Sequence, residues 1–515
     1  MYRGSNMELK EQLKESEVTK TSEELQKLGS VVDEVMAGAK EVDFLNPIIS
    51  NLNKILEKEN LNLFDRMLAN YLLGRAYNAI IIKTCSPEDA QYNNPLVWKE
   101  VYCYRMALRY VDYILCKECV ALYNAALHYK YDALIQLGNT YSHMGRFQDG
   151  IECYKAAALM MPHDSKWSFA FGYTLFNTHS YFDRNVEGFV VSLTKDLLKS
   201  CLKDKMIGLS ANSVYNTIKE WRSPSLDKDK QIEYESSEEG EYNRWVNKNI
   251  LRLNAYNDIN SMSALSQEDS LYFDGIYTPK EEPESWKLLF KMLNEIKQEY
   301  VSARYMLYYY FTHSGGTHIS DKNVRLADVY DLSNYSFHLE LAKSSFRSLY
   351  SILDKIAFAL NDYLCLGMKP ERVFFNKIWF EGDKSFKVKR GISKYKSVYG
   401  LAGLLFIRND IFGGDKDYLQ AEETKLLNKV RNAMEHRAII IVDDGVIDDD
   451  SAVLVISRSD FEDVSINLIK TVRQAIFCFV NAINHIECDK KMEISKNGEM
   501  IVPQEIDSVK DDEKV

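Results

Sequence analysis

The sequence has no apolar run that approaches the roughly 18 residues needed to cross a membrane, and its first ten residues lack the apolar core of a secretory signal. We therefore expect a cytoplasmic protein that does not enter a membrane. Apolar residues make up 46% of the chain and charged residues 27%, which is typical of globular proteins. At 515 residues the chain is too long for one ordinary core, so we expect about two to four domains.

Cysteine is sparse and unpatterned. The nine cysteines form no disulfide framework, which fits reduced thiols in a reducing compartment. Cys116 and Cys119 make one CxxC without the second pair that a zinc ribbon needs, and His313 and His318 lie in a glycine-rich loop without nearby ligands. The sequence also lacks a phosphate-binding glycine loop, an HExxH motif and a nucleophile elbow. We therefore predict no metal site and no cofactor.

Excess positive charge is absent as well. The net charge of −11 excludes a protein that coats nucleic acid with its whole surface, although a local basic site remains compatible with it. Much of the acidity lies in residues 235–241 and in the tail from residue 489 to residue 515. Both segments are predicted to be solvated or disordered.

A helical repeat is present in the first half of the chain. Its clearest copy alternates small and large residues at fixed spacing: Leu137, Gly138, Tyr141, Gly145, Phe147, Gly150, Tyr154, Ala157 and Pro162. This spacing predicts a helical hairpin in which small residues lie where the helices cross and large ones fill the gaps beside them. Partial copies occur at Leu73 and Gly74 with Tyr104, and from Trp167 onward.

This pattern, over roughly residues 60–200, resembles the tetratricopeptide repeat. It departs from the family in an enlarged loop with Ser86 and Pro87, and in Gly150, where the family usually has alanine. The resemblance implies a concave groove that binds a peptide or a protein segment. A structural spacer or a dimerisation arm is the plainer alternative.

The last third of the chain has the pattern of a helical bundle. Apolar residues recur at steps of three and four over residues 336–366, and further helices are predicted over 397–406, 422–436 and 459–486. Ser459 and Glu462 have the spacing of a capping box for the last of these. Two apolar runs, 438–442 and 452–456, flank a turn rich in Asp and Gly and predict a β-hairpin.

The third bundle helix carries the sequence Arg431-Asn432-Ala433-Met434-Glu435-His436, followed by Arg437. On a helix, Asn432 and His436 lie one turn apart on one face, and Arg431 is displaced toward Glu435. An imidazole with an ordinary pKa of about 6.5 can transfer protons at neutral pH, and a guanidinium can bind a phosphate at two points. These groups suit cleavage of a phosphodiester without a metal ion.

This motif resembles the R-x4-6-H signature of HEPN domains, whose ribonuclease members often have asparagine directly after the arginine. Arg431, Asn432 and His436 match that pattern. The resemblance implies that two motifs meet across a homodimer, or a higher homo-oligomer, to form one composite site. It implies Arg431 and His436 as catalytic residues, with Asn432 holding the histidine or the phosphate. Glu435, Arg437 and Asp354 are candidates for supporting roles.

Each residue also has a plainer explanation. Arg431 and Glu435 are spaced for a surface ion pair. His436 could simply favour the negative end of the helix dipole. Asp354, on the long helix of residues 336–366, could be an ordinary surface charge.

A substrate path is predicted where basic and aromatic residues alternate, because such segments contact phosphates and stack on bases. A solvated loop between two bundle helices is the alternative. The segment holds Lys384, Phe386, Lys387, Lys389, Arg390, Lys394, Tyr395, Lys396 and Tyr399.

The predicted fold is therefore mainly α, with N-terminal tetratricopeptide-like helical repeats followed by a C-terminal HEPN-like helical bundle with a small β-hairpin. The expected boundaries are a polar helical leader at 1–45, the repeat domain at 46–202, a linker or insertion at 203–283, the HEPN-like domain at 284–488 and a disordered tail at 489–515.

The function that combines these features is a metal-independent endoribonuclease that cleaves RNA by attack of the 2′-hydroxyl. The resemblance implies a toxin or an anti-phage defence effector that its repeat module regulates. A non-enzymatic adaptor whose C-terminal bundle only dimerises is the alternative. A peptide-responsive regulator that binds duplex DNA is a second one, although no helix-turn-helix reader is evident.

Overall fold

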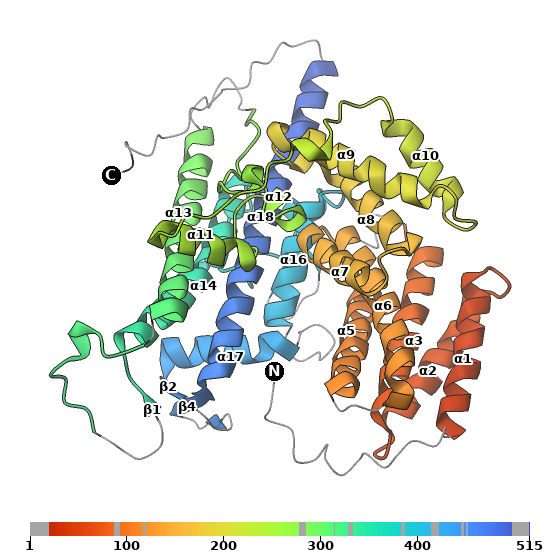
Figure 1. Ribbon diagram of the computed structural model, residues 1–515, viewed down its shortest axis with the longest axis horizontal. Helices are drawn as coiled ribbons and strands as arrows, with labels where there is room; N and C mark the ends of the chain where they lie inside the picture. The colour runs from red at the N-terminus through yellow and green to blue at the C-terminus, as the bar shows by residue number, and fades with distance from the viewer. Residues whose placement is uncertain are drawn as a thin grey trace.

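The computed structural model describes residues 20–86, 93–116, 120–277, 285–313, 315–327, 333–382, 387–413, 422–443, 448–449, 452–496 and 514. Within these ranges the chain is mainly helical, as the sequence predicted, and holds one small sheet. Figure 1 shows the helices of the N-terminal half, coloured red to yellow, stacked beside those of the C-terminal half, coloured green to blue. Pro87 of the enlarged repeat loop, Cys119 and most of the predicted tail lie outside the described residues. Residues 489–496 are helical, so the prediction of a disordered tail from residue 489 is wrong for that stretch.

The helices of the N-terminal half are α1 (Lys20–Met36), α2 (Leu45–Leu56), α3 (Leu63–Thr84), α5 (Pro95–Cys116), α6 (Val120–His143), α7 (Phe147–Met160), α8 (Ser165–Thr178), α9 (Arg184–Cys201) and α10 (Gly208–Ile218). Those that follow are α11 (Glu238–Lys248), α12 (Tyr256–Ile259), α13 (Ser285–His313), α14 (Phe337–Tyr363), α15 (Arg390–Ser393), α16 (Tyr399–Phe412), α17 (Glu422–His436) and α18 (Arg458–Lys496). The strands are β1 (Ser333–Asn334), β2 (Ala438–Val442), β3 (Asp448–Asp449) and β4 (Val453–Ser457).

The predicted hairpins of the N-terminal half are present, and their glycines explain why. A Cβ at Gly138 of α6 would lie 2.7 Å from a ring carbon of Tyr154 of α7. One at Gly74 of α3 would lie 2.8 Å from the ring of Tyr104 of α5. Each glycine therefore lets an aromatic ring of the next helix cross close to its backbone. The assignment of these hairpins to the tetratricopeptide family stays a prediction.

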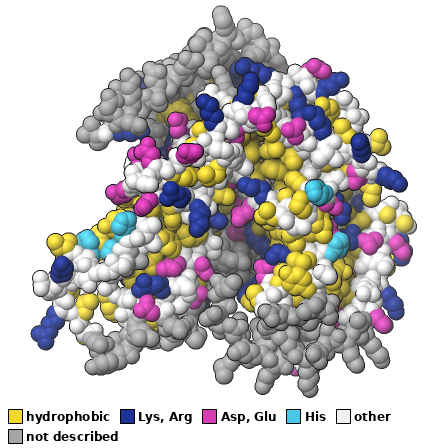
Figure 2. Space-filling model, in the orientation of Figure 1, with side chains coloured by type: hydrophobic (Ala, Val, Ile, Leu, Met, Phe, Trp, Pro, Cys, Tyr) yellow, Lys and Arg dark blue, Asp and Glu magenta, His cyan; other side chains and the backbone are white. Residues whose placement is uncertain are grey.

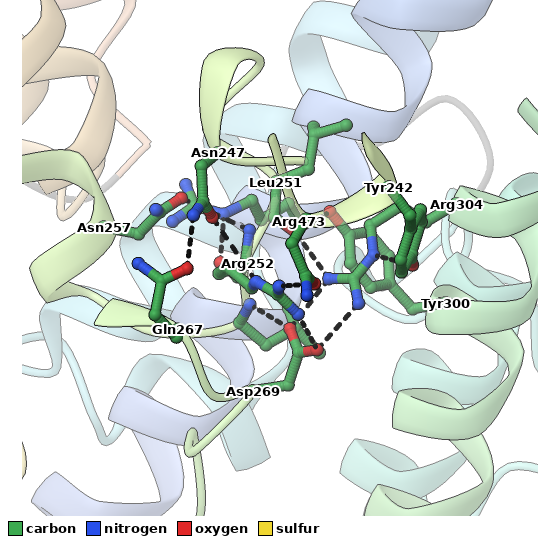
Figure 3. Close-up of polar contacts among 12 residues, drawn as sticks. Tyr242, Asn247, Leu251, Arg252, Asn257, Gln267, Asp269, Tyr300, Arg304 and Arg473 are labelled. Atoms are coloured by element: carbon green, nitrogen blue, oxygen red, sulfur yellow. Dashed lines mark hydrogen bonds and ion pairs between the residues drawn. The ribbon is translucent and has the colours of Figure 1, made fainter. Parts of the chain in front are cut away.

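Buried ion pairs join the segment between α10 and α13 to the C-terminal helices (Figure 3). Arg304 of α13 donates two hydrogen bonds to the Asp269 carboxylate, at 2.8 and 2.7 Å. Arg473 of α18 donates two to Asp258, at 2.9 and 2.7 Å, and a third to the carbonyl of Arg252. Because both donating arginines are buried, these pairs fix residues 252–269 against α13 and α18.

The C-terminal bundle surrounds α18. An 18-residue stretch of this helix has a mean hydropathy of 1.2, which by length and composition would be enough to cross a membrane, but 78% of that stretch is buried inside the protein. Such burial is typical of the central helix of a bundle. The core around it is lined by side chains from every long helix of this half: Leu293, Phe346, Leu405, Val430 and Ile476.

The predicted start of α18 is wrong by two residues. Ser457, and not Ser459, caps the helix, because the Ser457 hydroxyl accepts the N–H of Asp460 at 3.1 Å. The Glu462 carboxylate, predicted to complete a capping box, accepts instead from the Tyr310 hydroxyl at 2.8 Å. The helix also runs ten residues beyond the predicted end at Ile486.

The predicted β-hairpin is wrong in direction, although both apolar runs form strands. β2 and β4 pair in parallel, with Ala438 opposite Val453, and the sheet order is β1-β2-β4-β3. β3 lies antiparallel to β4, so the chain reverses twice between β2 and β4. Apolar alternation identifies a strand but carries no information about the direction of its neighbour.

The two halves of the chain meet at a buried carboxylate. Asp410 of α16, only 5% exposed, accepts two hydrogen bonds from Arg105 of α5, at 2.7 and 2.9 Å, and one from Arg146 in the turn between α6 and α7. Burial alone would raise the pKa of Asp410, but the two guanidinium groups outweigh it and hold the pKa below its ordinary value. The carboxylate therefore joins the N-terminal helices to the bundle as a charged group.

Candidate active site

Helix α17 presents the motif on its outer face. Its apolar residues occur at helical spacing and are buried against the bundle: Leu426, Leu427, Val430, Ala433 and Met434. Asn432, Glu435 and His436 are exposed, and Arg431 is half-buried between these two faces. The helix ends at His436, directly before β2, so the imidazole lies at the junction of helix and sheet.

Arg431 is held by an aromatic ring of the neighbouring helix α14. The carbon at the centre of its guanidinium lies 5.2 Å from the ring centroid of Tyr350. Nη1 of Arg431 also donates to Oδ1 of Asn432, at 3.1 Å. No ion pair joins Arg431 to Glu435 within the described ranges, so the plainer explanation of that spacing does not apply. The guanidinium is oriented by a ring and an amide, which leaves its charge free to bind an anion.

Asp354 lies one helical turn beyond Tyr350 on the same face of α14. Its Oδ1 accepts the N–H of Phe375 at 2.7 Å. Burial raises the pKa of Asp354, while that hydrogen bond and the positive charge of Arg431 partly oppose the shift. The carboxylate is therefore fixed in place and close enough to Arg431 to feel its charge.

His436 makes no hydrogen bond or ion pair with any described residue and is exposed. Its ring is thus open to a substrate or to a second chain. Arg437 is half-buried, and its N–H closes the helix by donating to the carbonyl of Ala433 at 2.9 Å. The side chains brought together around the motif are therefore those of Arg431, Asn432, Tyr350 and Asp354.

The basic segment predicted to bind RNA lies elsewhere on the surface. Lys387 pairs with Glu381 at 2.9 Å, and burial lowers the pKa of Lys389. The Lys394 ammonium lies 4.6 Å from the ring centroid of Tyr395, whose ring packs partly against the core. Lys384 and Phe386 fall outside the part of the chain that the structure describes.

Arg390, Lys394 and Lys396 are exposed and precede the first turn of α16. The motif helix docks at the other end, where the Thr424 hydroxyl donates to the carbonyl of Asp410. Arg431 lies over Tyr350 of α14, whereas Gly391 of the basic segment lies against Leu366, just beyond the end of α14. At about 1.5 Å per residue, the stretch of α14 from Tyr350 to its end separates the two features by roughly 20 Å. Within one chain, therefore, the basic segment does not touch the motif.

Tyr350 is the site residue that the sequence analysis missed. In the apolar pattern of residues 336–366, a tyrosine at this position fits an ordinary core residue. Its spacing of four residues from Asp354 was the available signal, because that spacing puts both on one face. What could not be foreseen is that α17 lies across this face.

Residues that could hold a metal ion are not grouped: within the described ranges no three His, Cys, Asp or Glu side chains come together as ligands. His313 and His318, the two histidines of the glycine-rich loop, stack on aromatic rings. His313 stacks on Tyr309 at 4.3 Å between centroids, and His318 stacks on Phe337 at 4.1 Å.

The C-terminal bundle is similar to a known protein family. Residues 280–486 match the model of the LA2681-like HEPN family, a region that runs from α13 into α18 and includes the motif helix. This match supports the HEPN superfamily for the C-terminal part of the chain. The N-terminal helices lie outside it. No curated protein and no solved structure matches the chain.

Proposed function

We propose that this HEPN-like chain is a metal-independent endoribonuclease whose active site is built on α17. The observation that carries the proposal is that one bundle helix holds Arg431 at the border of its outer face and His436 on that face. Arg431 is oriented by Tyr350 and Asn432, and His436 is exposed one and a half turns later. The Arg431 guanidinium suits the binding of a phosphate. The His436 imidazole suits the transfer of protons to and from the oxygens bonded to that phosphate.

In the proposed reaction the 2′-hydroxyl of the RNA attacks the adjacent phosphorus and gives its proton to the His436 imidazole. The bond from phosphorus to the 5′-oxygen breaks, and that oxygen takes up a proton as it leaves. The products carry a 2′,3′-cyclic phosphate and a 5′-hydroxyl. Arg431 stabilises the extra negative charge of the transition state, and Asn432 holds the guanidinium through its amide oxygen.

The reaction needs a base for the 2′-hydroxyl and an acid for the leaving oxygen, whereas each chain has one copy of the motif. We propose that a homodimer supplies the second imidazole, with two copies of α17 facing each other. The exposure of His436 supports this arrangement, because the ring is not covered by any described residue of its own chain.

The biological role proposed here is that of a toxin or defence effector controlled by its helical-repeat module. Support comes from Asp410, which binds arginines of the N-terminal helices while its backbone carbonyl accepts from Thr424 of the motif helix. A peptide or protein bound by the repeats could therefore alter the motif through α16. The basic segment before α16 is the proposed contact for RNA beyond the cut site.

The test is incubation of the purified full-length protein with transfer RNA and total RNA in EDTA. We expect cleavage by the wild type and a loss of about 10²-fold or more in rate for His436→Ala. His485→Ala, a histidine change in α18 outside the motif, serves as the matched control and should cleave like the wild type. Cleavage by His436→Ala at the full rate would reject the mechanism and favour the non-enzymatic adaptor.

A further inference from the structure

A cavity of about 410 Å³ opens between α13 and α14 beside the proposed active site. Its volume falls within the roughly 300–1,000 Å³ of small-ligand sites. Met292, Phe358 and Val373 give it apolar walls, and Ser351 and Asp354 contribute polar atoms. The Phe358 side chain is 38% exposed, so part of its ring is available for stacking.

The cavity adjoins the group proposed to bind phosphate. Asp354 belongs to its lining, and Tyr350, one turn earlier on α14, carries the Arg431 guanidinium. One helical turn is about 5.4 Å, so the cavity and the guanidinium are neighbours along α14. A nucleotide whose phosphate is bound by Arg431 would thus have this cavity within reach of its base.

The carboxylates of the cavity differ in what they can still bind. Glu295 lines the cavity and pairs with Lys355 at 2.8 Å. Lys355 also pairs, at 2.8 Å, with Glu299, which lies outside the lining. Asp354 forms no ion pair with a described residue, and its one hydrogen bond, from Phe375, is to Oδ1. Oδ2 of Asp354 therefore accepts from no described residue, and Oδ1 keeps a second lone pair, so the carboxylate can still accept two hydrogen bonds.

A carboxylate accepts hydrogen bonds and cannot donate them. It therefore favours a base with two adjacent N–H donors on one edge. Guanine has such a pair in N1–H and the N2 amino group. Adenine and cytosine have an acceptor nitrogen beside their amino group, and uracil has carbonyl oxygens on both sides of its N–H. These acceptors would face the carboxylate oxygen and repel it.

We propose that this cavity is a base-recognition site that selects guanine next to the cleaved phosphate, with Asp354 accepting from N1–H and N2 and Phe358 stacking on the ring. The proposal rests on the proposed function, since it takes Arg431 to be the phosphate-binding group. It names Asp354 as a specificity residue and identifies the preferred substrate as RNA with guanine at the cut site.

The test is equilibrium titration of full-length His436→Ala protein with the 3′-monophosphates of guanosine, adenosine, cytidine and uridine. Guanosine 3′-monophosphate should bind roughly tenfold tighter than the others, as expected for a good bidentate contact. Asp354→Asn should remove most of that difference. Because Asn keeps an oxygen that can accept the Phe375 N–H, the local fold should be preserved. Phe358→Ala should weaken all four nucleotides alike, and Glu295→Gln should leave the order unchanged.

Equal affinities for the four nucleotides, or a guanine preference that persists in Asp354→Asn, would overturn the base-recognition site. Neither result depends on cleavage. Conversely, a wild-type protein that binds guanosine 3′-monophosphate preferentially but does not cut RNA would support this site and reject the proposed nuclease activity. The two proposals can therefore fail separately.

Discussion

At the scale of single residues, the ring of Tyr350 is the least expected part of the site. It positions Arg431 without offering a charge, so the guanidinium keeps its full positive charge for a phosphate. The Tyr350 hydroxyl is buried and has no hydrogen-bond partner among the described residues. We therefore expect the ring, and not the hydroxyl, to matter for the proposed activity.

This leads to a paired prediction for Tyr350. Tyr350→Phe keeps the ring and removes a buried unpaired hydroxyl, so we expect wild-type RNA cleavage and equal or slightly higher stability. Tyr350→Ala removes the support of Arg431 and should slow cleavage by about tenfold, the effect of roughly 1.4 kcal/mol of lost positioning. Initial cleavage rates measure both. A Phe variant as slow as the Ala variant would show that the ring is not what matters.

A second residue-scale prediction concerns Glu100, which is 1% exposed in α5. Burial raises the pKa of its carboxyl to about 7, although hydrogen bonds from Thr140 and Asn78 oppose the shift. The folded state thus holds a proton that the unfolded state loses near pH 4.5. Stability should fall as the pH rises from about 4.5 to about 7, by roughly 3 kcal/mol in total.

Glu100→Gln removes this titration and retains an acceptor for Thr140. We expect the variant to match the wild type near pH 5 and to have the larger free energy of unfolding at pH 8. Urea denaturation at the two pH values measures the difference. An equal pH dependence in both proteins would show that Glu100 ionises normally in the fold.

At the scale of elements, helix α16 connects the two halves of the chain. Its Asp410 side chain binds Arg105 and Arg146, and its last carbonyl groups accept from α17: that of Asp410 from Thr424 and that of Ile411 from Asn428. The last turn of α16 therefore contacts both the motif helix and the arginines of the N-terminal half. This geometry is why we propose that the N-terminal helices regulate the site.

Asp410→Asn should destabilise the protein by about 3–5 kcal/mol, because it leaves two guanidinium groups beside an uncharged partner in a buried place. The wild-type pair has a depressed carboxyl pKa, so its contribution is present above about pH 4 and is lost as the pH falls below that value. Chemical denaturation at pH 7 and pH 3 measures both effects.

Glu381→Gln, at an exposed ion pair with Lys387, is the control and should change stability by less than about 1 kcal/mol. An Asp410→Asn protein as stable as the control would refute this role.

The elements themselves were largely predictable, whereas their contacts were not. Helical spacing located α14 and α17 to within a few residues, and the small residues at Gly74 and Gly138 predicted close helix crossings. The direction of β4 against β2 and the cap at Ser457 depended on packing that local patterns do not encode. For the site, the motif could be found from Arg431 to His436 alone. The partners of Asp410, which are 264 and 305 residues away along the chain, could not.

At the scale of the whole molecule, the proposed site is complete only when two chains meet. We expect a mass of about twice 59.6 kDa in solution. Mixing wild-type protein with an excess of His436→Ala, after subunit exchange, should reduce cleavage per wild-type chain, because most wild-type chains would then pair with an inactive partner. Sedimentation and cleavage assays over a series of ratios measure this. Activity that simply follows the amount of wild-type chain would indicate sites that lie within single chains.

The most direct test of the central claim is the chemistry of the RNA ends made by the wild-type protein in EDTA. Attack by the 2′-hydroxyl, with His436 transferring the proton, predicts 2′,3′-cyclic phosphates on the upstream fragments and 5′-hydroxyls on the downstream ones. Both ends should disappear together in His436→Ala. Fragments with 5′-phosphates and 3′-hydroxyls, or cleavage that starts only when magnesium is added, would contradict the account.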